Sequence, residues 1–272
     1  MGLNKALVVI PTTGAEVAAD AIKSVLAQTV PTDLLLVCDG EKFRKDVESM
    51  VEEFHDERIT VCYLPYNTGG GGFYGHRIMA GFAHLIPHDY VLFLDQDNWF
   101  EPDHVDECIK EIERYSFDFV YSLRKVSDQN GHYVCNDDCE SLGRWPAWVN
   151  EQAFLVDTSS YCYKTEFFNQ VSYLWHHGWG ADRRFFTILK DHFKHKNFGC
   201  TGKYTLNYRC GGNEGSVQPE FFLQGNAKMK EKYPGNYVLD WKYDPSVMKM
   251  VLIPIFENSH EETFWKLKYS NL

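Results

Sequence analysis

Short apolar runs alternate with amphipathic segments over the first 123 residues, and this alternation constrains the fold more than any other feature. The apolar runs predict buried strands at Ala6–Ile10, Leu34–Cys38, Ile59–Leu64, Tyr90–Leu94 and Phe119–Leu123. Apolar residues recur with a helical period at Val17–Gln28, Phe43–Phe54, about Tyr74–Leu85 and in a segment that begins near Pro102. Strands that alternate with helices favour an α/β fold with a mostly parallel sheet and right-handed crossovers.

The pattern is less regular after Leu123. We expect Val126–Trp148 to be irregular, short strands at Ala153–Asp157, Tyr161–Tyr163 and Thr205–Tyr208, and one helix at Asp182–Phe193. Residues after Gln218 give no assignment. No Pro-, Ser- or Gly-rich linker divides the chain, so we expect a single domain.

Composition narrows the classes of protein that fit. The net charge of −11 argues against a nucleic-acid-binding protein, because phosphate backbones need a basic face. The eight cysteines form no C-x-x-C pair, which favours free thiols in a reducing compartment. No apolar run reaches the ~18 residues of a membrane span, and none precedes the first strand. We therefore expect a cytoplasmic protein without a transmembrane segment, and leave peripheral contact with a membrane surface open.

Two acids, Asp95 and Asp97, follow the fourth predicted strand directly, with Gln96 between them. The carboxyl ends of strands are where open α/β sheets bind ligands. A hard divalent cation, Mn²⁺ or Mg²⁺, would offset this negative charge and would also contact phosphate oxygens. A solvated turn with two acids is the alternative.

Three other predicted strands end in residues suited to a nucleotide. Pro11-Thr12-Thr13 follows the first strand, and its small side chains would allow a planar base to approach. Asp39-Gly40 follows the second strand, and the carboxylate can accept from a pyrimidine N–H or a ribose hydroxyl. A Gly-rich segment, residues 67–77, follows the third strand and contains Asn67, Gly69 and Arg77. Each segment alone is also compatible with an ordinary turn.

The Gly-rich segment supports a rival interpretation. Gly70, Gly72 and Gly75 fit G-x-G-x-x-G, and Asp95 follows at about the 20-residue distance of a ribose-binding acid. This pattern is typical of an NAD-type oxidoreductase. However, it follows the third strand, whereas the fingerprint normally opens the first βαβ unit. A nucleotidyltransferase is also conceivable, but Thr12-Thr13-Gly14-Ala15 lacks the basic residue that such a loop normally carries.

Taken together and in this order, these segments resemble glycosyltransferase family 2, which has the GT-A fold, over roughly residues 5–215. The resemblance implies a Rossmann-like sheet flanked by helices and a nucleotide-sugar substrate. It divides residues 1–217 into a nucleotide-binding half, 1–123, and an acceptor half, 124–217. Residues 218–272 form an unassigned C-terminal extension on the acceptor side.

The resemblance also implies roles for the residues in these segments. Asp97 would be the main metal ligand, and Asp95 would bind metal or ribose. The other residues expected to bind the nucleotide-sugar are Pro11, Thr12, Thr13, Asp39, Asn67, Gly69, Arg77 and Gln96, with Arg77 near the base or the diphosphate.

Asp182 stands at the start of a predicted helix, where family members carry an acid. The resemblance implies that it is the catalytic base, and it can also cap the helix. Trp179, Trp175 and Trp148 are candidates for stacking on an acceptor sugar, with core packing as the alternative.

One position departs from the family pattern. Gly211 stands where family members often have a His that completes the metal site, and Asn213 and His195 are candidate replacements. We expect a metal-dependent inverting glycosyltransferase that uses a nucleotide-sugar, with UDP as the preferred carrier, and a saccharide or lipid-linked acceptor. The alternatives are the oxidoreductase and a catalytically inactive module that binds sugar-nucleotides or glycans.

Overall fold

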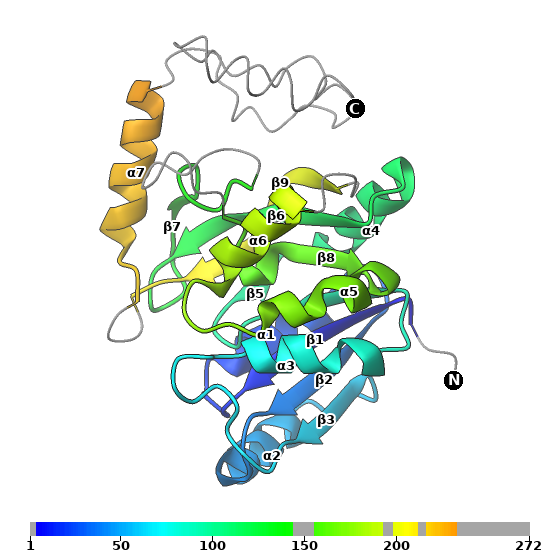
Figure 1. Ribbon diagram of the computed structural model, residues 1–272. Coiled ribbons are helices and arrows are strands. Elements are labelled where there is room, and N and C mark those ends of the chain that lie inside the picture. The colour runs from blue at the N-terminus through cyan, green and yellow to red at the C-terminus, as the bar shows by residue number, and fades with distance from the viewer. Residues whose placement is uncertain (1–3, 144–154, 193–197, 212–215, 233–272) are drawn as a thin grey trace.

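The computed structural model describes residues 4–143, 155–192, 198–211 and 216–232. Within these ranges the strands form one sheet in the order β3-β2-β1-β4-β8-β6-β9-β5, and β7 pairs with β6 (Figure 1). Helices cover both faces of this sheet. The expected α/β architecture is confirmed.

The strands in the first 93 residues all pair in parallel with one another. The elements, in which η denotes a short 3₁₀-helix, are β1 (Ala6–Thr12), α1 (Ala18–Leu26), β2 (Thr32–Cys38), η1 (Glu41–Phe43), α2 (Arg44–Glu52), β3 (Ile59–Tyr63), α3 (His76–Phe82), η2 (Ala83–Leu85) and β4 (Tyr90–Phe93). β1 pairs in parallel with β2 and β4, and β2 pairs in parallel with β3. The carboxyl ends of these strands therefore meet at one edge, as the sequence predicts.

The elements after β4 make the sheet mixed. They are β5 (Trp99–Phe100), α4 (His104–Tyr115), β6 (Phe119–Ser127), β7 (Tyr133–Asn136), η3 (Thr158–Ser160), β8 (Tyr161–Lys164), α5 (Thr165–Val171), η4 (Ser172–Trp175), α6 (Ala181–His192), β9 (Phe198–Arg209) and α7 (Pro219–Lys232). β8 runs antiparallel to both β4 and β6, whereas β6 and β9 are parallel.

Several predictions for the chain after β4 are wrong. Residues 126–148 were expected to be irregular, but β6 continues to Ser127 and β7 follows it. β6 tolerates polar residues here because it pairs with β7 on one side and with β9 on the other. Residues 155–157 are not a strand, and residues 153–154 lie outside the described ranges. α5 and α7 were not predicted. α7 packs on β6 and β7 through buried Phe222, and Asn226 donates to the Asn136 carbonyl at 2.7 Å.

Strand side chains alternate between two apolar clusters, one on each face of the sheet. Val8, Ile10 and Leu92 face α1, α2 and α4, whereas Val9 and Phe93 face α3, α5 and α6. Burial on both faces explains why these strands are apolar without interruption in the sequence. All eight cysteines are free. None of the helices in the described ranges combines the length and apolar character needed to cross a membrane.

Phe119 lies at the centre of an aromatic group on the face of the sheet that α3, α5 and α6 cover. Its ring stacks on Phe198 at 4.9 Å and on Phe167 at 5.4 Å between centroids, and it lies within 6.0 Å of Tyr161 and Tyr163. We expect Phe119→Ala to lower the free energy of unfolding by about 3–5 kcal/mol, because it leaves a cavity among rings that cannot all move inward.

Urea denaturation of the purified variant measures this change. Tyr133→Ala, at a ring that is 61% exposed, is the control and should change the free energy by no more than about 0.5 kcal/mol. Equal effects of the two substitutions would contradict the central role of Phe119.

Candidate active site

An open cleft of about 1170 Å³ lies at the carboxyl ends of the parallel strands. It brings together most of the residues that the sequence singles out: Pro11, Thr12, Thr13, Asp39, Asn67, Gly69, Asp95, Gln96, Asp97, Trp179 and Asp182. The turns after β1, β2 and β4 supply the floor of the cleft, and the start of α6 and the end of β9 supply a wall. Residues from both halves of the chain therefore share one cavity.

Asp39 holds the Gly-rich segment against the end of β2. One carboxylate oxygen accepts from the Thr68 amide at 2.6 Å and from the Thr68 hydroxyl at 2.8 Å, and the other accepts from the Gly69 amide at 2.8 Å. A side chain at Gly69 would meet the Tyr74 carbonyl at 2.4 Å, so the loop closes only around a glycine. A carboxylate has about four acceptor sites, so Asp39 retains capacity for one ligand donor.

Gln96 ties the turn after β4 to the turn after β1. Its side-chain oxygen accepts from the Thr12 hydroxyl at 2.8 Å and from the Thr13 amide at 3.0 Å. The Thr12 hydroxyl in turn accepts from the Gly14 amide at 3.0 Å. These bonds fix the floor of the cleft beside the two acids.

Asp95 and Asp97 concentrate negative charge on this floor. Burial, and then the charges of Asp97 and Asp157, raise the pKa of Asp95 well above its ordinary value, although a hydrogen bond from Ser159 opposes the rise. Burial also raises the pKa of Asp97, and the charge of Arg209 opposes it. The two carboxylates are thus a pair that a cation would stabilise.

The residues present fit a divalent cation that substrate oxygens help to hold. Among the described residues, no group of three or more His, Cys, Asp or Glu side chains could hold a metal ion. Mg²⁺ commonly needs only one or two carboxylates together with phosphate oxygens and water, and Asp95 and Asp97 meet that requirement. Gly211, with φ of +77°, carries no ligand, and Asn213 and His195 lie outside the described ranges.

Asp182 lies in the first turn of α6 and lines the cleft. Its carboxylate accepts from the Arg183 amide at 2.7 Å. Because α6 begins at Ala181, Asp182 lies inside the first turn and is not the cap that the sequence suggests, but its negative charge still favours the helix start. Burial, and to a lesser degree the charge of Asp157, raise its pKa, whereas Arg124 and Arg183 act in the opposite direction. A carboxylate with a raised pKa that faces a cleft is suited to accept a proton.

Two predicted site residues, Arg77 and Trp175, do not line the cleft. Arg77 is not among the cleft-lining residues; its guanidinium lies 3.5 Å above the Phe73 ring and donates to the Thr68 carbonyl at 3.1 Å. Trp175 is fully buried and stacks on Phe185 at 4.2 Å, so it packs in the core and cannot stack on an acceptor. This burial corrects the prediction for Trp175.

The remaining predicted tryptophans differ in what the structure says of them. Trp179 is 83% exposed and lines the cleft close to Asp182 in the sequence, and Trp148 lies outside the described ranges.

The loop that carries Trp179 touches the Gly-rich segment across the cleft. His76 Nδ1 lies 2.9 Å from the His177 carbonyl oxygen, and the Phe73 and His176 rings are 5.6 Å apart. A side chain at Gly178 would meet the Gly72 carbonyl at 3.2 Å. These contacts join the two loops into one rim.

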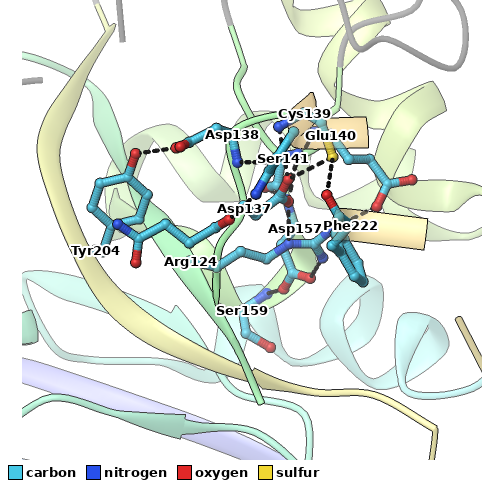
Figure 2. A network of polar contacts seen from close by, with 12 residues as sticks. Arg124, Asp137, Asp138, Cys139, Glu140, Ser141, Asp157, Ser159, Tyr204 and Phe222 are labelled. Carbon is cyan, nitrogen blue, oxygen red and sulfur yellow. Dashed lines mark hydrogen bonds and ion pairs between the residues drawn. The ribbon is translucent and has the colours of Figure 1, made fainter. Parts of the chain in front are cut away.

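A buried ionic cluster that was not predicted from the sequence also lines the cleft (Figure 2). Arg124, inside β6, pairs with Asp137, Glu140 and Asp157. A charged residue that follows the apolar run at 119–123 is the signal that could have revealed it, because a charge within a buried strand needs partners.

A known protein family matches most of this chain. The model of the family described as "Glycosyl transferase family 2" matches residues 7–209. No curated protein sequence matches the chain.

Solved structures of S. aureus TarS share the fold. TarS 1–349 in complex with UDP-GlcNAc aligns with a TM-score of 0.57 and 16% identity, over 91% of this chain and 70% of that one. TarS 1–349 in complex with UDP aligns with a TM-score of 0.52, also at 16% identity, over 91% of this chain and 69% of that one. A longer TarS structure aligns with a TM-score of 0.53 and 16% identity, and this chain covers 42% of it.

Proposed function

The chain belongs to glycosyl transferase family 2 and is a glycosyltransferase, and from this premise we propose that it moves a sugar from a nucleotide-sugar to an acceptor hydroxyl in a metal-dependent, inverting reaction. One observation carries the proposal: a single cleft holds the acid pair Asp95 and Asp97 together with Asp182. The pair can bind a cation that contacts a diphosphate, and Asp182 can accept a proton. These are the two tasks that such a transfer requires.

In this proposal the donor occupies the floor of the cleft. Asp39, Asn67 and the turn at residues 11–13 would surround the nucleotide base, and Asp95 and Asp97 would hold Mn²⁺ or Mg²⁺ at the diphosphate. The metal would neutralise charge on the departing nucleoside diphosphate. Arg209 and Arg183 also line this space and lower the local excess of negative charge.

Asp182 would act from the wall of the cleft that the start of α6 forms. Its carboxylate would accept the proton of the acceptor hydroxyl while that oxygen attacks the anomeric carbon and the nucleoside diphosphate leaves from the opposite face. Such a displacement inverts the anomeric centre. Trp179, exposed at the rim, would contact a saccharide or lipid-linked acceptor.

We propose UDP as the carrier. The remaining acceptor capacity of Asp39 suits the N3–H of uracil, and the structurally similar TarS binds UDP and UDP-GlcNAc. Family membership argues against the oxidoreductase, as does the position of the Gly-rich segment after the edge strand β3. The eight free thiols support a cytoplasmic location. An inactive sugar-nucleotide or glycan-binding module is a second candidate, favoured only by Gly211 at the expected His position.

Ligand-induced stabilisation tests the proposal. UDP with Mn²⁺, at 100 times its Kd, should stabilise the protein by about 2.7 kcal/mol, because it binds only the folded state. The melting temperature should then rise by roughly 5–10 °C. Differential scanning fluorimetry with UDP, GDP, TDP and NAD, each with and without Mn²⁺, measures this. Stabilisation by NAD alone would contradict sugar transfer.

Asp182→Asn should lower kcat by about 10²–10⁴-fold, since the amide cannot accept the proton. UDP affinity in the presence of Mn²⁺ should stay unchanged, because the base does not touch the nucleotide in this proposal. Donor turnover and calorimetric UDP binding measure the two quantities. Asp106→Asn, in the first turn of α4, is the matched control. Normal turnover by Asp182→Asn would remove Asp182 from the role of base.

The pH dependence of kcat/KM should follow the raised pKa of Asp182. A base works only when ionised, and a raised pKa means that ionisation is lost at a higher pH than usual. Activity at saturating Mn²⁺ should therefore fall, as the pH is lowered, with a midpoint above the ordinary aspartate value of about 4. A pH–rate profile checks this, and a midpoint at or below that value would show that the environment of Asp182 does not raise its pKa.

A further inference from the structure

The guanidinium of Arg124 binds three carboxylates at once. Nε donates to Asp137 at 2.7 Å, Nη1 to Asp157 at 2.5 Å and Nη2 to Glu140 at 2.6 Å. The arginine is 3% exposed, and Figure 2 shows the three acids around its head group. The planar fork of an arginine fixes all three directions at once, which a lysine could not do.

Aromatic rings fix the guanidinium in place. Its central carbon lies 4.3 Å from the Tyr208 ring centroid and 5.3 Å from that of Phe222. Tyr208 comes from β9 and Phe222 from α7, so elements distant in sequence hold one side chain. A buried charge with this many fixed partners has one arrangement.

Of the three carboxylates, Asp137 is occupied by its own loop. It accepts from the amides of Cys139, Glu140 and Ser141 at 3.1, 2.8 and 2.9 Å. Asp157 and Glu140, by contrast, line the cleft. The ionic cluster thus has a structural side and a side that faces the ligand space.

Asp157 connects the cluster to the acid pair. Its second oxygen accepts from the Ser159 amide at 2.8 Å and so caps η3. The Ser159 hydroxyl oxygen then accepts from the Asp95 amide at 3.0 Å and from Asn98 Nδ2 at 3.3 Å. Asn98 in turn accepts from the Arg209 amide at 3.0 Å. Asp157 therefore holds the Ser159 backbone, and the Ser159 hydroxyl holds the turn at residues 95–98.

We propose that Arg124 is a positioning residue, which acts through Asp157 and Ser159 to set the orientation of the Asp95–Asp97 turn for binding a divalent cation. This inference rests on the proposed function. Mutation of a residue that orients a metal ligand through hydrogen bonds lowers metal affinity by about 10–100-fold. The same effect is expected here from Arg124, which would act through Asp157 and Ser159.

Ser159→Ala breaks the last link and leaves the Arg124 ion pairs intact. We expect Mn²⁺-dependent UDP binding to weaken by about tenfold. UDP affinity without metal should change by less than about twofold, because the link acts on the metal site. Isothermal titration calorimetry of the full chain with UDP, with and without Mn²⁺, measures both without turnover.

Ser160→Ala is the matched control. Ser160 is the next residue of η3 and equally buried, and its hydroxyl has no hydrogen-bond partner in the described part of the chain. It should bind UDP as wild type does, with and without Mn²⁺. Arg124→Lys keeps the charge but loses the fork, and it should weaken Mn²⁺-dependent binding at least as much as Ser159→Ala does.

The outcomes separate the two claims. If wild type binds UDP more tightly with Mn²⁺ and Ser159→Ala does the same to an equal extent, the positioning role is wrong and the proposed function stands. A loss of affinity in Ser159→Ala that is equal with and without Mn²⁺, or shared by Ser160→Ala, would also overturn it. If wild type shows no Mn²⁺-dependent UDP binding, metal-dependent transfer from UDP fails, and this inference fails with it. If Arg124→Lys does not fold, Ser159→Ala still decides.

Discussion

The buried charge of Arg124 is the interaction on which the second half of the structure depends. Burying three carboxylates and one guanidinium costs free energy, and only close, fully bonded geometry offsets that cost. Here each of the three guanidinium nitrogens donates at 2.5–2.7 Å. Removing one partner of such a cluster commonly costs 3–5 kcal/mol, roughly, because a charge is left unpaired. The cluster thereby ties β6, the loop at 137–141 and the start of η3 into one arrangement, and excludes others.

The cluster also explains why the cleft can hold so many acids. Asp95, Asp97 and Asp182 share the cavity with Glu140 and Asp157. Arg124 neutralises part of the charge of the last two, which limits the repulsion that they exert on the acid pair and on Asp182. Burial raises the pKa values of Asp95, Asp97 and Asp182, and the charge of Asp157 adds to the rise in each case. The fold therefore pairs the framework acids closely and leaves the ligand-facing carboxylates only partly compensated.

The first half could be predicted from the sequence because its strands are buried on both faces and its helices have one apolar stripe. The turns at Thr12, Asp39 and Asp95 follow from parallel strands that end at one edge. The second half could not be predicted as well. Arg124 and Lys125 interrupt the apolar pattern of β6, and their partners come from residues distant in sequence. Tertiary packing likewise placed Arg77 over Phe73 and Trp175 in the core, and no local pattern distinguishes these positions from ligand contacts.

The rim formed by the Gly-rich segment and the loop before α6 has a mechanical consequence. His76 and His177 are 101 residues apart in sequence, and the His76 ring nitrogen Nδ1 lies 2.9 Å from the His177 carbonyl oxygen. Neither loop can swing outward alone without breaking that contact. Entry of a substrate and departure of a product would then depend on a shared displacement of both loops, which the His76 ring and the His177 backbone hold together.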